Sequence, residues 1–295
     1  MGSGVLASLD IIDELGVGDR VVGMASTSID YLEKYSNDAS IKNLGTIKEA
    51  DLEAVMECEP DIIFIGGRLS KSYDALSEIA PVVYLATDTN EGLVNSVSKN
   101  AKTIASIFGM EDKVDSLMSD FGARIDAIKK ISSGKTALVG MTTSGSFNLL
   151  GNDGRCSLIG VEAGFNNLTA AGSTSTHGNE SSFETVVQQN PDYIFVMDRD
   201  SAISTAGAKT AKEIVENELV KTTDAYKNNH IIYLEHSNVT SACFIFFLLP
   251  SITAIFFNIS IVWLSVSTPY ILILLIILPS AILAFGIMQL SIPAS

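Results

Sequence analysis

The sequence predicts an α/β protein with two Rossmann-like lobes, a long backbone helix between them and an apolar helical tail. The first observation is an internal repeat, in which DLEAVMECEPDIIFIGGR at 51–68 returns as SFETVVQQNPDYIFVMDR at 182–199. The second is that short apolar segments alternate with amphipathic segments of helical length, which is typical of parallel sheets. The third is that the whole net charge of −15 lies before residue 240. Together they predict two similar domains followed by a segment of another kind.

The first lobe is expected at 1–110 and the second at 134–239, each with alternating strands and helices. In the first lobe, strands are predicted at Val21–Met24, Ile62–Ile65 and Val82–Leu85, and helices at Val5–Leu15, Ala50–Cys58, Tyr73–Ile79 and Gly92–Phe108. In the second lobe, strands are predicted at Thr136–Met141, Phe147–Leu149, Tyr193–Met197 and Ile231–Leu234, and helices near Ser157–Ala163, Phe183–Gln189 and Ala211–Asn217.

A single long helix is predicted over Glu111–Ile131, inside an inter-lobe segment expected at 111–133. Apolar residues recur there at helical spacing, namely Val114, Leu117, Met118, Phe121, Ile125 and Ile128. The Ser-Ser-Gly sequence at 132–134 is expected to end the helix. Because a helix is a stiff connection, we expect lobe movements to be small compared with those about a flexible hinge.

Each copy of the repeat ends in an arginine, Arg68 in the first and Arg199 in the second, directly after a predicted strand. Open α/β sheets bind ligands outside the carboxyl ends of their strands. A third arginine, Arg155, follows the glycine-rich turn 151–154. Guanidinium groups suit flat, oxygen-rich anions, so the arginines predict a cleft that closes on an anion. The alternative is that they are solvated loop charges.

The composition and motifs argue against several other functions. The acidic charge argues against nucleic acid, which requires clustered Lys and Arg. The cysteines Cys58, Cys156 and Cys243 show no CxxC or zinc spacing, and no nucleophile elbow, Walker A loop or HExxH motif is present. A nucleotide-binding α/β enzyme that uses the loop 151–154 is the alternative function. That loop lacks GxGxxG and has no accompanying acid–base pair.

The polar loop Thr-Ser-Thr-His-Gly at 174–178 presents His177 ahead of a predicted helix. An imidazole is a common ligand of metal ions. A single loop histidine is more often exposed to solvent or close to a helix cap. The residue type by itself leaves both interpretations open.

Several motifs resemble the iron-siderophore subgroup of the substrate-binding proteins of ABC importers, above all the binders of catecholate siderophores. They are GGRLSKSYDALSEIAPVVYLATDT from Gly66, Thr-His-Gly at 176–178, NPDYIFVMDRD from Asn190 and HIIYL from His230. The resemblance covers residues 4–239, with the motifs in the same order in both lobes. It implies two α/β lobes joined by a helix, a ferric chelate held in the cleft between them, and no catalytic residue.

The resemblance also implies roles for particular residues. The ligand-binding residues that it implies are Arg68, Arg155 and Arg199. His177 would coordinate the iron, and Glu53 and Glu184, one in each lobe, would dock on arginines of the permease. The ferric siderophore would be the ligand, with no intrinsic cofactor. The protein would work in iron transport as a periplasmic protein or a lipoprotein on the outer face of the cytoplasmic membrane.

The chain departs from that family at both ends. Relatives begin with an export signal and with a strand ahead of the segment that resembles Gly4–Leu15, and both are expected to be missing here. After the strand at Ile231–Leu234, relatives continue into an aromatic loop and a closing helix. The tyrosine of that loop can be a second iron ligand. Here the pattern stops at Val239.

The tail at 240–295 contains no Asp, Glu, Lys, Arg or His. Two segments, Ala242–Leu264 and Tyr270–Leu290, are each long enough to cross a bilayer core, which takes about 20 apolar residues. The tail is interpreted as a frameshifted or read-through product, as a membrane hairpin or as a buried helical pair. We favour the first because the break falls inside a domain. Membrane contact is expected through the tail, and a membrane-anchored or fused transporter subunit is a further alternative function.

Overall fold

The computed structural model describes residues 1–3, 6–27, 32–88, 91–154, 156–169, 178–199 and 209–234. Two candidate site residues, Arg155 and His177, lie outside these ranges, as does the tail with its candidate spans Ala242–Leu264 and Tyr270–Leu290. Within the described ranges, every helix is too short or too polar to cross a membrane.

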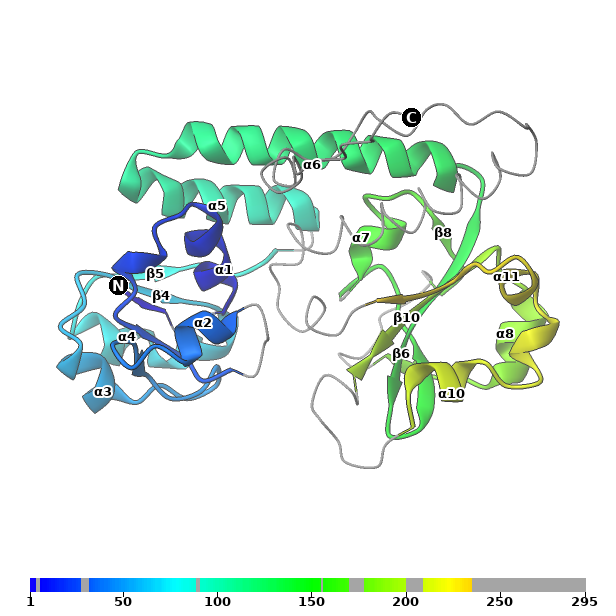
Figure 1. Cartoon of the computed structure of the whole chain (residues 1–295), viewed down its shortest axis with the longest axis horizontal. Helices are drawn as coiled ribbons and strands as arrows, with labels where there is room; N and C mark the ends of the chain where they lie inside the picture. The colour runs from blue at the N-terminus through cyan, green and yellow to red at the C-terminus, as the bar shows by residue number, and fades with distance from the viewer. Residues whose placement is uncertain are drawn as a thin grey trace, which may run out of the picture. The chain divides into compact units, whose positions relative to one another are not determined.

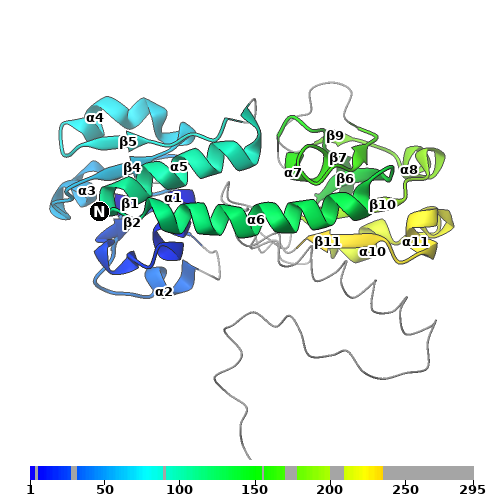
Figure 2. The ribbon, with the colours of Figure 1, turned by 90° about the horizontal axis from the view of Figure 1, so that it is seen from above.

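The first sheet consists of five parallel strands in the order β3-β2-β1-β4-β5. They are β1 (Gly2–Ser3), β2 (Gly23–Met24), β3 (Lys42–Asn43), β4 (Ile63–Ile65) and β5 (Val82–Tyr84) (Figure 2). The chain moves outward from β1 to β3 and then returns to place β4 on the other side of β1. The expectation of a missing first strand was wrong, because Gly2 pairs with both Gly23 and Ile63.

Helices cover both faces of this sheet. They are α1 (Leu6–Glu14), α2 (Glu33–Ser36), α3 (Leu52–Glu57), α4 (Tyr73–Ser77) and α5 (Leu93–Phe108). Successive strand residues point to opposite faces. Phe64 therefore packs in one core with α1 and α5, while Ile63 and Ile65 pack in another with α3 and α4. All three side chains are buried, as expected for a parallel strand covered on both faces.

The second sheet has the order β11-β10-β6-β7-β9, and β8 pairs with the start of β6. Its strands are β6 (Thr136–Thr143), β7 (Ser146–Leu149), β8 (Asn166–Asn167), β9 (Asn179–Glu180), β10 (Tyr193–Asp198) and β11 (Ile231–Leu234) (Figures 1 and 2). Strands β8, β6, β10 and β11 are parallel, whereas β7 and β9 form an antiparallel edge. Because β10 pairs with one side of β6, β8 lies on the other side. The chain therefore crosses over β6 on its way from β8 to β10.

The central strand β10 is buried on both faces. Tyr193, Phe195 and Met197 belong to one core, in which Phe165 meets Tyr193 and Phe195 edge-on with ring centroids 5.2 and 5.1 Å apart. Ile194 and Val196 belong to the other core. The helices of this lobe are α7 (Ser157–Gly160), α8 (Phe183–Gln189), α10 (Ala211–Val215) and α11 (Asp224–Lys227).

The predicted long helix is present as α6 (Glu111–Ser132), which packs beside α5 (Figures 1 and 2). Val114 lies in a core of the first lobe, whereas Phe121, Ile125 and Ile128 lie in a core of the second. Helix α5 is also tied to the second lobe, because Glu162 Oε1 accepts a hydrogen bond from Val94 N over 3.3 Å. The division into domains at 1–110, 111–133 and 134–239 remains a prediction.

The repeat has the same local structure in both copies. Asp51 and Ser182 cap α3 and α8 by accepting hydrogen bonds from the backbone N–H three residues further on, at 3.0 and 3.3 Å. The prolines Pro60 and Pro191 are both buried, and β4 and β10 follow them. The predicted order of helix, turn and strand is therefore confirmed.

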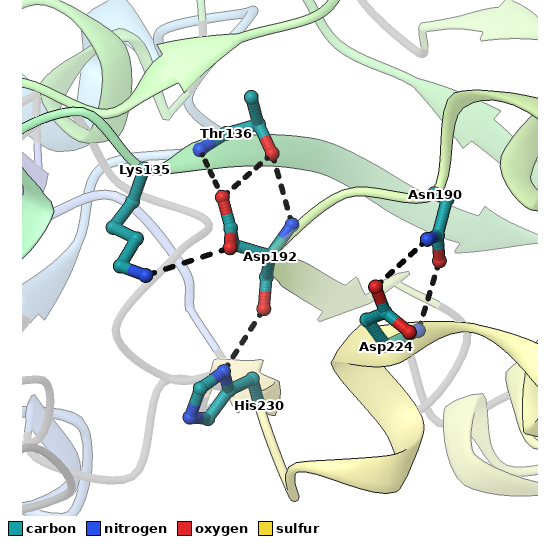
Figure 3. A network of polar contacts seen from close by, with 6 residues as sticks. All are labelled: Lys135, Thr136, Asn190, Asp192, Asp224 and His230. Atoms are coloured by element: carbon teal, nitrogen blue, oxygen red, sulfur yellow. Dashed lines mark hydrogen bonds and ion pairs between the residues drawn. The ribbon is translucent and has the colours of Figure 1, made fainter.

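A network of polar contacts connects the amino ends of three strands in the second sheet (Figure 3). The Asp192 carboxylate accepts hydrogen bonds from Thr136 N at 2.8 Å and Thr136 Oγ1 at 2.9 Å, and Lys135 Nζ lies 3.6 Å away. The Asp192 carbonyl oxygen lies 3.0 Å from Nδ1 of His230, the residue before β11. One aspartate thus joins β6, β10 and β11 at their starts.

Asn190 makes a second connection from the same turn (Figure 3). It ends α8 in the left-handed conformation with φ 40°, a conformation that asparagine adopts more readily than most residues. Its Oδ1 accepts from Asp224 N at 2.8 Å, and its Nδ2 donates to Asp224 Oδ2 at 2.9 Å. The Asn-Pro-Asp sequence therefore positions α11 as well as β10.

We expect Asp192→Ala to lower the free energy of unfolding by about 1–2 kcal/mol at pH 7, because Thr136 N–H loses its charged acceptor. Burial raises the pKa of Asp192, but the hydrogen bonds from Thr136 and the charge of Lys135 outweigh it and lower that pKa. The stabilisation is therefore complete above the unfolded pKa of about 4 and is lost as the pH falls through the lower folded value. Urea unfolding at pH 7 and pH 3 measures both effects.

The matched control is Asp126→Ala on α6, whose carboxylate lies 4.0 Å from Lys129 Nζ and is 73% exposed. An exposed pair of this kind contributes about 0–1 kcal/mol. If the two variants unfolded at the same urea concentration at pH 7, the stabilising role of the Asp192 hydrogen bonds would be refuted.

Candidate functional site

The two repeat-related arginines lie at corresponding places in their sheets. In the first sheet the strand order reverses between β1 and β4, and Arg68 follows β4. In the second sheet the chain crosses β6 to reach β10, and Arg199 follows β10. A reversal of strand order leaves a crevice at the carboxyl ends, and this is where open α/β sheets bind ligands. The structure therefore places each arginine after the strand at which the chain reverses or crosses the order of its own sheet.

Arg199 is half-buried and held by a neighbouring strand. Its Nη1 donates a hydrogen bond to Thr143 Oγ1 over 3.1 Å, and Thr143 is the last residue of β6. The preceding residue, Asp198, accepts a hydrogen bond from Ala211 N, the first residue of α10, at 2.9 Å. The carboxyl end of β10 is thus connected to both β6 and α10.

Arg68 has a different environment. It lies in the short 3₁₀ helix Gly67–Ser72 that follows β4, and its side chain is exposed. Leu69, the next residue, is buried in the first-lobe core and anchors the turn. The Arg68 guanidinium makes no hydrogen bond or ion pair with any other residue that the structure describes.

The glycine-rich turn that precedes Arg155 is held by two asparagines that the sequence analysis did not single out. The buried Asn167 donates from Nδ2 to Leu150 O at 2.9 Å and to Asn152 Oδ1 at 3.1 Å. A Cβ atom at Gly160 would collide with the same Asn152 oxygen, so a larger residue there would displace the Asn152 side chain. The structure fixes the start of this loop, while Arg155 itself lies outside the described residues.

Glu53 and Glu184 occupy the same position in their helices, the second residue of α3 and of α8. Both side chains are exposed, and neither belongs to a hydrophobic core or caps a helix within the described residues. Carboxylates are favoured in the first turn of a helix by the positive end of its dipole. The pair therefore presents two accessible negative charges from equivalent elements.

The described histidine has a structural role at the other end of the sheet. His230 stacks on Tyr193 with ring centroids 4.2 Å apart and an interplanar angle of 4°. It directly precedes β11 and so lies at the amino ends of the parallel strands, whereas Arg199 follows the carboxyl end of β10. Among the described ranges, no group of three or more His, Cys, Asp or Glu side chains could hold a metal ion. His177 lies outside those ranges.

Comparison with known proteins gives one family and several similar chains. The model of the family described as "Periplasmic binding protein" matches residues 4–237. The petrobactin-binding protein YclQ of Bacillus subtilis is 38% identical over 235 residues, which cover 77% of this chain and 72% of that protein. Its crystal structure superposes with a TM-score of 0.73 and 34% identity, covering 88% of this chain and 89% of that one.

A second solved structure is similar in both sequence and fold. The periplasmic catecholate-siderophore binding protein VctP of Vibrio cholerae has a TM-score of 0.78 and 30% identity, covering 86% of this chain and 91% of that one. These matches confirm the predicted α/β fold class. They also confirm the resemblance that was based on the Thr-His-Gly and Asn-Pro-Asp motifs.

Proposed function

We propose a function for this chain, which belongs to the periplasmic binding protein family. The chain binds a ferric siderophore of the catecholate type and delivers it to an ABC importer. The observation that carries the proposal is the equivalent placement of Arg68 and Arg199, each after the strand at which its sheet changes direction of growth, where open α/β sheets bind ligands. The relatives support the ligand class, since two of them are described as petrobactin-binding and catecholate-siderophore binding. The siderophore is cargo in this proposal and not a cofactor.

The chemistry of the ligand matches the arginines. Ferric catecholate complexes are anions with flat, oxygen-rich faces, and guanidinium groups bind such oxygens through a planar fork of N–H donors. The net charge of −15 does not oppose this, because charges more than about 8 Å away are largely screened at physiological salt. Arg155, at the end of the turn that Asn152 and Asn167 hold, is proposed as the third arginine.

Two further roles are proposed for residues outside the arginine set. His177 coordinates iron at positions that the siderophore leaves open, as a neutral imidazole. Glu53 and Glu184 contact positive side chains of the permease, one from each lobe. Their exposure and their equivalent helix positions support this docking role. Domains at 1–110 and 134–239, with a linker at 111–133, are proposed as the two units that close on the ligand.

The alternative functions have less support. The loop 151–154 leads into α7, a helix of four residues, which is too short to offer the phosphate site of a nucleotide-binding helix. The family consists of substrate-binding proteins, and we propose that this chain has no catalytic activity. We propose that it works outside the cytoplasm. Membrane contact through the tail remains a prediction, since 240–295 lies outside the described residues.

Replacing either described arginine should weaken siderophore binding. We expect Arg68→Ala and Arg199→Ala each to raise the Kd for ferric petrobactin by about 10-fold to 150-fold, since a hydrogen bond to a charged group contributes about 1.5–3 kcal/mol. Isothermal titration measures the Kd. The matched control is Arg124→Ala on α6, whose guanidinium pairs with Asp120 at 2.6 Å, and which should bind like the wild type. Equal Kd values for all three variants would exclude the arginine site.

Reversing the docking charges should separate binding from transport. We expect the double variant Glu53→Lys/Glu184→Lys to bind the ferric siderophore normally and to lose uptake of labelled iron, because two cations would face the positive side chains of the permease. Glu111→Lys is the control, since Glu111 also lies in the first turn of a helix, α6, and should keep uptake. Loss of siderophore affinity in the double variant would instead assign these glutamates to binding or folding.

The proposed iron ligand predicts a selectivity. A four-donor siderophore leaves two positions of an octahedral ferric ion open, whereas a six-donor siderophore leaves none. We expect His177→Ala to weaken binding of a four-donor chelate by about 10-fold or more and to change binding of a six-donor chelate by less than about twofold. Titration of both chelates, followed through their visible absorption, tests this. A similar loss for both chelates would contradict direct coordination by His177.

A further inference from the structure

We propose that Thr143 is a positioning residue that holds the guanidinium of Arg199 in the orientation in which it meets the ligand. The inference rests on the proposed function, because it takes Arg199 as a ligand-binding residue. It starts from one contact, the 3.1 Å hydrogen bond from Arg199 Nη1 to Thr143 Oγ1. Guanidinium groups only donate hydrogen bonds, so the threonine hydroxyl is the acceptor.

The backbone fixes the place of this hydroxyl. Thr142 is paired with Asp198 across the parallel β6–β10 ladder, and Thr143 is paired with Ser146 in the antiparallel hairpin with β7. The hairpin turns at Ser144 and Gly145, which have φ values of 52° and 80° and form a tight two-residue turn. Thr143 is therefore held from both sides. Its β-branched side chain adds little freedom of its own, since few χ1 rotamers are open to it.

A held arginine binds an anion with a smaller loss of side-chain freedom than an unrestrained one. Long side chains lose more rotamer freedom on binding than other residues do, and preorganisation removes part of that cost in advance. Arg68 in the first lobe shows the contrast, because it is exposed and has no hydrogen bond to another described residue. Of the two arginines, only Arg199 in the second lobe therefore has a threonine hydroxyl that holds its guanidinium within the described residues.

The neighbouring residue offers a matched control. Thr142 has the same side chain and lies one position earlier on β6, but its hydroxyl donates to Met197 O at 3.3 Å and is fully buried. Because successive strand residues point to opposite faces, the Thr142 hydroxyl lies on the other face of the sheet from that of Thr143. Thr142→Val removes a hydroxyl from the same strand without touching Arg199.

The test is the Kd of the full chain for ferric petrobactin, measured by isothermal titration. We expect Thr143→Val, which keeps the shape of the side chain but removes the acceptor, to raise the Kd by about fivefold to tenfold, the change that about 1–1.4 kcal/mol produces. Thr143→Ser keeps the hydroxyl and should stay within about twofold of the wild type. Thr142→Val should also stay within about twofold.

A double-mutant cycle distinguishes positioning from a general structural effect. In the Arg199→Ala background, Thr143→Val should have no further effect on the Kd, because the group that it positions is gone. If the two effects were additive, or if Thr143→Val bound as tightly as the wild type, the positioning role would be overturned. Urea unfolding of each variant shows whether it is folded, and Thr143→Ala provides a second removal of the acceptor.

The same measurements separate this inference from the function on which it rests. Failure of the wild type to bind the chelate would overturn the proposed function and this inference with it. Binding that is weakened by Arg199→Ala but unchanged by Thr143→Val would overturn this inference alone.

Discussion

The two lobes depend on a pair of helices that each contribute to one hydrophobic core in the first lobe and one in the second. In α5, Val97 packs in a second-lobe core, while Ala101 and Ile104 pack in a first-lobe core. In α6, Val114 packs in the first and Phe121 in the second. Because interiors are close-packed, a shift of either helix disturbs both cores at once. The sheets that carry the arginines are therefore packed against the same two helices.

The second sheet has its polar network and its terminal arginine at opposite ends of one strand. Asp192 joins three strands at their amino ends, and Arg199 follows the carboxyl end of the same strand, β10. Parallel strands bring all their carboxyl ends to one edge, so residues at that edge can vary without disturbing the network at the other. The Asn-Pro-Asp turn and the terminal arginine lie in one motif because they precede and follow the same strand, β10.

Regular periodicity and strong turn signals were enough to predict most helices and the longer strands. Helix α6 was predicted over Glu111–Ile131 and extends over Glu111–Ser132, since its apolar residues recur over many turns. The strands β1, β3, β8 and β9 were missed because each has two residues and, unlike β2 in Val21–Met24, none lies in an apolar run. Gly2–Ser3 is a strand because β2 and β4 pair with it on both sides, and these partners lie far away in the sequence.

The sequence by itself determined the repeat, and with it the equivalence of Arg68 with Arg199 and of Glu53 with Glu184, because equal local patterns fold into equal helix–turn–strand units. The tertiary structure decided that both arginines lie beside a reversal of strand order, and that Thr143 holds one of them while the other is exposed. The physical reason is that a local pattern specifies a strand but not its neighbours. The bond between Arg199 and Thr143 joins residues 56 positions apart, and it exists only because the β6–β10 register brings them together.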